Sequence, residues 1–289
     1  MPFLQNKTLA GSLRIALLLC ALSLPAPAAA AAPDSARAEA KAQPALWAQA
    51  VRIYDKNKDL APGKVFQKIQ ELDDDGRVKS ESNVELSLAL DGEGKIKSDI
   101  VKATKDGKDV TAEERKKAAE RAKKEAEREK KKEAERASKG DAGDASKEGS
   151  HSISSGDNPF NADIQNGVRI TETNARETVD GRSCIRFGYS YPAPTEKPAK
   201  GKPAMVKGSA WIEEGTGNPV KVEFTNDPLP KGAKSMLTTL HYAGGENGSW
   251  VLKKMEFEGS GSFLFFKKRI RGDISLGDYW KYIEPASTK

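Results

Sequence analysis

The run GSGSFLFFKKRIR, from Gly259 to Arg271, is the densest aromatic stretch of the chain. Taken as a single strand with a period of two, it sends large side chains to both sides, with Phe263 and Phe265 on one and Leu264, Phe266 and Ile270 on the other. An antiparallel sheet with one solvated face does not need apolar side chains on both sides. We therefore expect the sheet to curl around an apolar interior, with helices, a second sheet or a partner covering its other side.

Short alternating runs bounded by turn residues fill the surrounding stretch from Ala204 to Ile283. Within it we expect strands joined by short turns, as in an antiparallel meander, at residues 205–212, 220–224, 235–242 and 250–258. The alternation sets Trp211 on the opposite face from Ile212. It also places Val220, Val222 and Phe224 together on one face of the returning strand.

Earlier runs of the chain predict five more strands, at residues 64–71, 84–90, 95–103, 168–173 and 183–191. The second of these alternates strictly between Val84 and Leu90, as a half-buried strand does. Asp180-Gly181 predicts a hairpin between the last two, and Asp74 to Gly76 predicts a turn after the first.

A short amphipathic helix is expected between Pro44 and Tyr54, because Leu46, Trp47 and Val51 recur at near-helical spacing. We expect it to dock on the sheet. Trp47 then either anchors the core or lines a ligand space, and the spacing leaves both open.

The segment from Thr111 to residue 139 consists almost entirely of Glu, Lys, Arg and Ala and predicts a charged helix. Thr111 and Glu114 have the spacing of a capping box. The segment has no apolar seam for a coiled coil, so we expect the helix to stand in solvent. Lys130 to Lys132 leave open a contact with anionic lipid headgroups, whereas the interspersed Glu residues argue against nucleic acid.

The first residues predict export. Lys7 and Arg14 precede an apolar segment, residues 15–24, that is shorter than the roughly 20 residues needed to span a bilayer. The small residues that follow predict a signal peptide cleaved near Ala30 to Ala32 and a periplasmic location. Cys20 lies inside the apolar segment after Leu19, which argues against lipidation.

The mature chain keeps a mild positive bias and one thiol. Its formal charge falls from +6 to +4 when Lys7 and Arg14 are removed. Cys184 remains as the single cysteine, so no intramolecular disulfide can form, and a buried strand thiol is its expected role.

These patterns together predict a mainly β protein of the α+β class. We expect a curled antiparallel sheet, or unclosed β-barrel, with short covering helices and an inserted solvent-exposed charged helix. The predicted organisation is a signal peptide (residues 1–32), an N-terminal helix and first strands (33–110), the charged helix (111–139), a disordered linker (140–157) and the main antiparallel portion of the same domain (158–284).

The chain is poor in the residues that carry catalysis. His151 and His241 are its only histidines, which with the single cysteine of the mature chain excludes a closed zinc site of the Cys/His kind. No GxSxG elbow or phosphate-binding glycine loop is present. We therefore predict no catalytic residues, no metal and no cofactor, with a secreted hydrolase centred on His241 as the enzymatic alternative.

A resemblance to a known family rests on the stretch AWIEEGTGNPVK, from Ala210 to Lys221, followed by His241-Tyr242 and Gly248-Ser249-Trp250. This arrangement resembles the recurrent hairpin of periplasmic outer-membrane lipoprotein-sorting proteins, the LolA-like superfamily. The resemblance covers mainly residues 205–282. It implies an unclosed antiparallel β-barrel whose helices cover an apolar concavity that holds acyl chains. The charged insertion departs from that pattern, and no functional residue of the family can be matched here.

The leading hypothesis is an exported binding protein or carrier for a hydrophobic ligand, such as a lipid or the acyl chains of a lipoprotein. The candidate cavity residues are Trp211, Phe224, Met255, Phe257, Phe263 and Phe265. We expect a hydrophobic ligand or lipidated protein as partner, no nucleic acid, and no transmembrane segment in the mature chain. The alternative is a non-enzymatic cell-envelope interaction or regulatory protein that uses the sheet surface and the charged helix.

Overall fold

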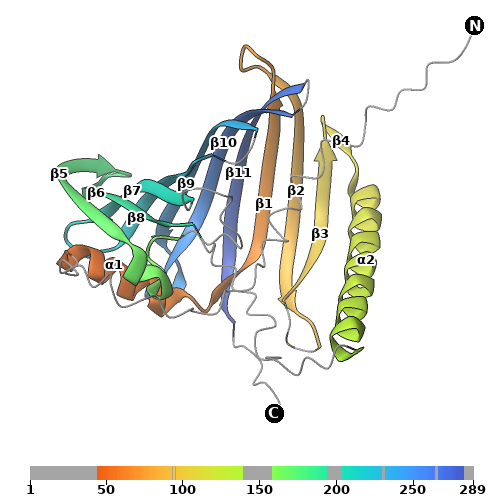
Figure 1. The fold of residues 1–289 in the computed structure, drawn as a ribbon, viewed down its shortest axis with the longest axis horizontal. Helices are drawn as coiled ribbons and strands as arrows, with labels where there is room; N and C mark the ends of the chain where they lie inside the picture. The colour runs from red at the N-terminus through yellow and green to blue at the C-terminus, as the bar shows by residue number, and fades with distance from the viewer. Residues whose placement is uncertain are drawn as a thin grey trace, which may run out of the picture.

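The computed structural model describes residues 44–92, 94, 96–138, 158–193, 204–229, 232–263 and 266–282. Within these ranges the strands form one antiparallel sheet of 11 strands in the order β4-β3-β2-β1-β11-β10-β9-β8-β7-β6-β5 (Figure 1). The strands are β1 (Leu60–Leu72), β2 (Val78–Leu90), β3 (Ile96–Lys105), β4 (Lys108–Asp109), β5 (Arg169–Val179), β6 (Arg182–Pro192), β7 (Met205–Glu213), β8 (Pro219–Asp227), β9 (Ala233–Gly244), β10 (Trp250–Phe263) and β11 (Phe266–Lys281). The predicted curled, unclosed antiparallel sheet is confirmed.

Strands that follow one another in the chain are neighbours in the sheet, except β4 and β5, which are its two edges; one long-range pairing closes the order. β1 pairs with β11 in a register that runs from Leu60 opposite Lys281 to Leu72 opposite Arg269. This pairing joins the N-terminal strands β1–β4 to the C-terminal meander β5–β11. The two ends of the described chain therefore meet in the interior of the sheet.

The helices differ in what they cover. Figure 1 shows α1 (Ala45–Asn57) at the end of the sheet formed by β5–β9 and α2 (Thr111–Ser138) beside β3 at the other end. Two short 3₁₀ turns, η3 (Ala162–Gly167) and η4 (Glu246–Gly248), complete the described elements.

Two predicted turns are confirmed, and in each the backbone has the positive φ angles that such turns require. Asp180 and Gly181 both have positive φ, 49° and 76°, and join β5 to β6 as a two-residue turn. Gly76 has φ 81° in the turn from β1 to β2, a conformation that costs a glycine little.

The stretch from Gly259 to Arg271 is a hairpin and not a single strand. β10 ends at Phe263, β11 begins at Phe266, and these two residues pair with each other. The prediction of one continuous strand with two apolar sides was therefore wrong. It failed because the connection between the strands contains no glycine, proline or asparagine to announce a turn. Leu264 and Phe265 lie outside the described residues.

The register divides the sheet into two faces. Residues that pair across antiparallel strands share a face, so Val65, Leu86, Leu276 and Ile274 lie on the same side. Through the pairing of Met255 with both Ile274 and Leu240, this side is also the one that α1 covers, and we call it the α1 face. The other side is the opposite face.

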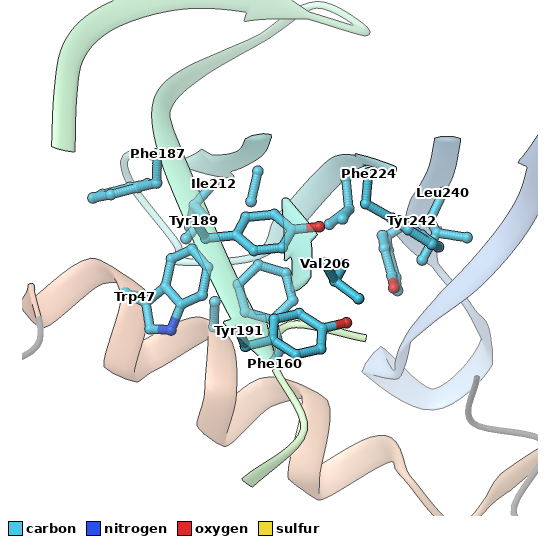
Figure 2. Packing of buried hydrophobic residues seen from close by; sticks show 13 residues of the cluster. Trp47, Phe160, Phe187, Tyr189, Tyr191, Val206, Ile212, Phe224, Leu240 and Tyr242 are labelled. Carbon is cyan, nitrogen blue, oxygen red and sulfur yellow. The ribbon is translucent and has the colours of Figure 1, made fainter. Parts of the chain in front are cut away.

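The main core lies between α1 and the α1 face of β6–β9. Figure 2 shows Trp47 pointing from α1 toward Phe160 and the aromatic side chains of β6. The Trp47 ring centroid is 4.9 Å from that of Phe160 and 5.8 Å from that of Tyr189. The full set of buried members is Trp47, Ala50, Phe160, Phe187, Tyr189, Tyr191, Val206, Ala210, Ile212, Val222, Phe224, Leu240 and Tyr242.

Trp47 is therefore a core residue. Its side chain is 0% exposed, and its indole Nε1 donates a hydrogen bond of 3.1 Å to Oε1 of Gln165 in η3. Of the two roles that the sequence left open, the structure shows the core anchor.

Along β1, β2, β10 and β11 the opposite face is polar and carries several ion pairs. Lys254 Nζ lies 3.1 Å from Asp273 Oδ1 on the neighbouring strand, and Lys68 Nζ lies 3.0 Å from Glu81 Oε2. Its exposed large apolar side chains include Phe66 and Leu237, at 45% and 47% exposure. This face has the composition of a solvated sheet surface.

The charged helix α2 is not free-standing. The Arg115 side chain donates to two backbone carbonyls of β3, through Nε to Ile100 at 2.7 Å and through a terminal nitrogen to Val101 at 3.3 Å. Glu114 is buried and pairs with Lys117 at 3.0 Å. The prediction that the helix stands in solvent therefore fails for its first turns, because β4 pairs with only two residues of β3 and leaves the rest of that edge to cover.

The predicted capping box at Thr111 does not form. The Thr111 hydroxyl accepts a hydrogen bond of 2.9 Å from the backbone N–H of Ala103. The N–H of Glu114 donates instead to the carbonyl of Val110 at 3.0 Å. The hydroxyl thus ties the start of the helix to β3.

Candidate ligand-binding face

A second apolar cluster lies on the α1 face, in the half of the sheet away from α1. Its buried members are Val65 of β1, Leu86 of β2 and Ile274 of β11. Partly exposed side chains from β2, β3, β10 and β11 surround them: Val84, Leu88, Ile100, Met255, Phe257 and Leu276. All members of this open cluster, among the residues that the structure describes, come from strands.

The open cluster is continuous with the main core. Met255 packs against both sets of residues. Apolar surface therefore extends from beneath α1 across β10, β11, β1 and β2 without a polar break at the junction. The two halves differ in whether helices pack on them. Residues of α1 and η3 belong to the main core, whereas the open cluster contains no helical residue in the described ranges.

One polar residue is embedded in the open cluster. Gln67 of β1 is only 5% exposed and lies opposite Ile274 on one side and Val84 on the other. A carboxamide among aliphatic side chains is unusual enough to call for a partner.

A small pocket marks the border between the two halves. It has a volume of about 70 Å³ and is lined by Tyr54, Asn57, Lys58, Leu60, Pro62, Tyr242, Trp250, Val251, Leu252, Leu276 and Tyr279. Pockets that enclose drug-sized ligands measure about 300–1,000 Å³. This pocket is therefore too small to enclose an acyl chain.

A buried tyrosine, Tyr242, and a half-buried one, Tyr279, lie at this border. Asn158 Nδ2 donates a hydrogen bond of 2.6 Å to the Tyr242 hydroxyl, and the Tyr279 hydroxyl donates to the carbonyl of Leu252. Burial raises the pKa of both phenols above the ordinary value, so both stay neutral hydrogen-bonding groups.

The six residues predicted to line a cavity fall into three groups. Met255 and Phe257 belong to the open cluster, and Phe224 is buried in the main core on the same face. Trp211 lies on the opposite face with Cys184 and Val220, so its assignment to the same groove was wrong. The side chain of Phe263 and the whole of Phe265 lie outside the described residues.

The position of Trp211 follows from the strand alternation. The sequence predicted that Trp211 and Ile212 point to different faces of the strand. The structure confirms this, because Ile212 is in the main core and Trp211 is not. Indole Nε1 of Trp211 donates to Glu177 Oε2 at 2.7 Å, and the Lys221 ammonium lies 4.6 Å from the ring centroid. Val220 joins Trp211 because a bulge opposite Trp211 and Ile212 shifts the alternation in β8, which corrects the expected grouping with Val222.

The residues that sequence reasoning missed are those of β1 and β11, above all Val65, Gln67 and Ile274. The alternation from Val84 to Leu90 did indicate a half-buried strand. What was absent was any signal that β1 and β11, about 200 positions apart, pair with each other. That pairing alone brings the open cluster together.

Catalytic groups are sparse in this region. His241 lies on the opposite face, with Nε2 3.0 Å from Glu256 Oε2, and a hydrogen bond from Lys254 is the largest cause that lowers the pKa of Glu256. Cys184 is buried, and burial raises the pKa of its thiol, which disfavours the nucleophilic thiolate. Within the described ranges, no group of three or more His, Cys, Asp or Glu residues is placed to hold a metal ion.

The helices of the described ranges offer no segment of sufficient length and apolar character to cross a bilayer. The predicted signal peptide lies outside the described residues and stays a prediction.

Comparison with known proteins gives a structural likeness only. No protein-family model matches the chain, and no curated protein matches it. Among solved structures, the chain is similar to a LolA superfamily protein from Nitrosomonas europaea, at 10% identity, covering 83% of this chain and 93% of that one with a TM-score of 0.35.

Two further structures are MucB in complex with MucA(peri), at 8% identity, 80% and 97% coverage and a TM-score of 0.19, and the MucA/MucB complex of Pseudomonas aeruginosa, at 8%, 82% and 99% and 0.20. The expected LolA-like resemblance is confirmed as a loose structural match. Identities and TM-scores this low carry no argument about the ligand or partners of this chain.

Proposed function

We propose that this protein is an exported, periplasmic, non-enzymatic binding protein or carrier for a hydrophobic ligand, a lipid or the acyl chains of a lipoprotein. The observation that carries the proposal is the open cluster: an apolar surface continuous with the core but without a helix over it in the described ranges. The opposite face of the same strands is charged and suited to water. The sheet is therefore amphipathic in the sense required for one-sided ligand burial.

The composition of three segments outside the described residues supports an external cover for the open cluster. Residues 33–43 and 194–203 contain no large aliphatic or aromatic side chain, and residues 139–157 contain only Ile153. Such segments have little apolar surface to bury. An acyl chain has it in abundance, since each methylene removed from water contributes about 0.8 kcal/mol.

The organisation expected from the sequence fits this role. We propose that cleavage near residue 32 releases one β domain, built from residues 33–110 and 158–284 and interrupted by the charged helix and its linker. In this arrangement the ligand-binding strands β1, β2, β10 and β11 come from both parts of the domain. A carrier that holds its ligand only by burial needs no cofactor or metal.

The direct test is binding by the intact exported protein. Organic extracts of natively purified protein are examined by mass spectrometry for co-purifying lipid, and the protein is titrated with the neutral apolar fluorophore N-phenyl-1-naphthylamine. We expect a lipid in the extract and saturable fluorophore binding that added fatty acyl esters displace. Absence of both would overturn the proposal.

Two matched variants locate the site. Leu88→Glu places a charge in the open cluster, and Leu237→Glu places the same charge on the opposite face, where the leucine is already exposed. We expect the first to weaken fluorophore binding at least about tenfold, because a buried charge without a partner is costly, and the second to leave binding unchanged. Circular dichroism melts establish that both variants fold. Equal effects of the two variants would place the site elsewhere.

A further inference from the structure

Gln67 is a buried polar residue in an otherwise aliphatic part of the sheet. Its strand neighbours on the α1 face are Val65 and Ile69, and its cross-strand partners are Ile274 and Val84. All four are aliphatic. The side chain is 5% exposed, yet its carboxamide has no hydrogen-bond partner among the residues that the structure describes.

Other buried polar side chains show what a satisfied group looks like here. Asn158 donates to the hydroxyl of Tyr242 at 2.6 Å, and Glu114 pairs with Lys117 at 3.0 Å. Gln70, three residues from Gln67 on the same strand but on the opposite face, donates to Glu81 Oε2 at 2.7 Å. Because a buried amide without a partner is destabilising, its persistence in an apolar cluster calls for a ligand.

The carboxamide is within reach from outside. Its nitrogen and oxygen have no partner in the described part of the chain, but they are not completely sealed and keep some contact with solvent. Its cross-strand partner Val84 and the cluster member Phe257 are themselves partly exposed. A group that lies on the open cluster can therefore contact the amide without a rearrangement of the sheet.

The surroundings select the chemistry of that group. A hydrocarbon would cover the amide and leave it unpaired, which is costly. A free carboxylate would need a cation beside the amide. The register places Lys105 and Lys253 on this face but two strands away from Gln67, on β3 and β10. Lys268 of β11 is already paired with Glu71, at 3.6 Å. A neutral carbonyl satisfies the amide N–H without bringing in a charge.

We propose that Gln67 donates a hydrogen bond from its carboxamide to the carbonyl oxygen of an ester- or amide-linked acyl chain bound on the open cluster. This inference rests on the proposed function and assigns its ligand class: acyl esters and amides, in preference to free fatty acids and plain hydrocarbons. Gln67 is then the residue that sets specificity, while the apolar side chains supply affinity.

The experiment measures displacement of N-phenyl-1-naphthylamine from the full mature chain by four ligands with the same chain length: methyl laurate, lauramide, laurate and dodecane. For the wild type we expect the ester and the amide to bind about tenfold more tightly than dodecane, as a buried hydrogen bond allows. Laurate is expected to bind more weakly than its methyl ester.

Substitution of Gln67 removes the preference. Gln67→Met keeps the length and flexibility of the side chain, and Gln67→Leu is a second variant in case the first does not fold. Either is expected to bring the ester-to-dodecane ratio to about one, mainly by tightening dodecane binding. Gln70→Leu, the same kind of change on the opposite face of the same strand, is expected to keep the wild-type ratio.

The outcomes separate this inference from the proposed function. If the wild type binds all four ligands equally, or if the preference survives in Gln67→Met, the inference is overturned while the binding site stands. If the wild type binds none of them, both fail. A phosphatidylglycerol and a diacylated lipopeptide, tested in the same way, distinguish the two sources of the acyl carbonyl, and both are expected to lose affinity to the same extent in Gln67→Met.

Discussion

The ring of Phe257 lies directly over Gly272, its cross-strand neighbour on β11. A Cβ atom on Gly272 would come within 2.1 Å of the Phe257 ring, far inside van der Waals contact. The absent side chain of the glycine therefore provides the space in which the ring lies flat on the sheet. This arrangement places Phe257 within the open cluster instead of above it.

Gly272→Ala is expected to destabilise the protein by about 1–3 kcal/mol, the usual cost of inserting a methyl group into a filled site. Urea unfolding followed by circular dichroism measures the change. The displaced ring also disturbs the open cluster, so fluorophore binding should weaken with it. Gly277→Ala, on the same strand with nothing within 4 Å of the added Cβ, is the matched control and should stay near wild type. Equal losses in the two variants would contradict the role of the ring.

The parts of this fold that the sequence predicted are those controlled by local chemistry. The hairpin at Asp180-Gly181 was predictable because both residues adopt the left-handed conformation that such turns require. The opposite placement of Trp211 and Ile212 followed from the two-residue period of a strand. Neither feature depends on distant residues.

The remaining features depended on pairing that a single strand does not encode. The turn between Phe263 and Phe266 has no turn residue, so the aromatic run was taken for one strand. The bulge that moves Val220 to the Trp211 side is invisible in a regular alternation. The candidate site itself needed the pairing of β1 with β11, which brings Gln67 next to Ile274.

Tyr242 is expected to control stability at alkaline pH. Burial raises its folded-state pKa above the ordinary value of 10.0, so its contribution is fully present below about pH 10 and is lost as the pH rises through the folded pKa. Tyr242→Phe should therefore flatten the decline of unfolding free energy above pH 10. At neutral pH the same variant should cost about 1–3 kcal/mol, because it leaves the buried amide of Asn158 without its hydroxyl partner. An alkaline decline identical to wild type would refute this assignment.

Glu81 is expected to contribute at the acid end. Hydrogen bonds from Asn83, Gln70 and Lys68 lower its pKa from 4.5 to about 2. A lowered folded-state pKa means that the stabilisation is present above about pH 4.5 and is lost as the pH falls through about 2. Glu81→Gln should make the acid side of the stability curve shallower, as measured by urea unfolding at a series of pH values.

Removal of one donor provides an independent check on the same carboxylate. Asn83→Ala deletes the largest single cause of the shift, so the acid transition should move to higher pH without loss of the Glu81 charge at neutrality. If both Glu81→Gln and Asn83→Ala leave the acid limb as in the wild type, another carboxylate controls it.

Arg115 fixes α2 to an otherwise open strand edge. Unpaired edge strands invite association with other chains, and here the guanidinium donates to the carbonyls of Ile100 and Val101 on the uncovered side of β3. Arg115→Ala is expected to cost about 1–2 kcal/mol of unfolding free energy, because exposed charge-assisted hydrogen bonds are worth less than buried ones. It should also increase self-association, measured by size-exclusion chromatography with light scattering.

Arg128→Ala, at an exposed position farther along α2, should change neither property. Ligand binding should be unaffected in both variants, because Arg115 contacts Ile100, whose side chain belongs to the open cluster, only at the backbone carbonyl. Wild-type stability and a monomeric state in Arg115→Ala would show that α2 does not protect the edge, whereas loss of ligand binding would tie the helix to the site itself.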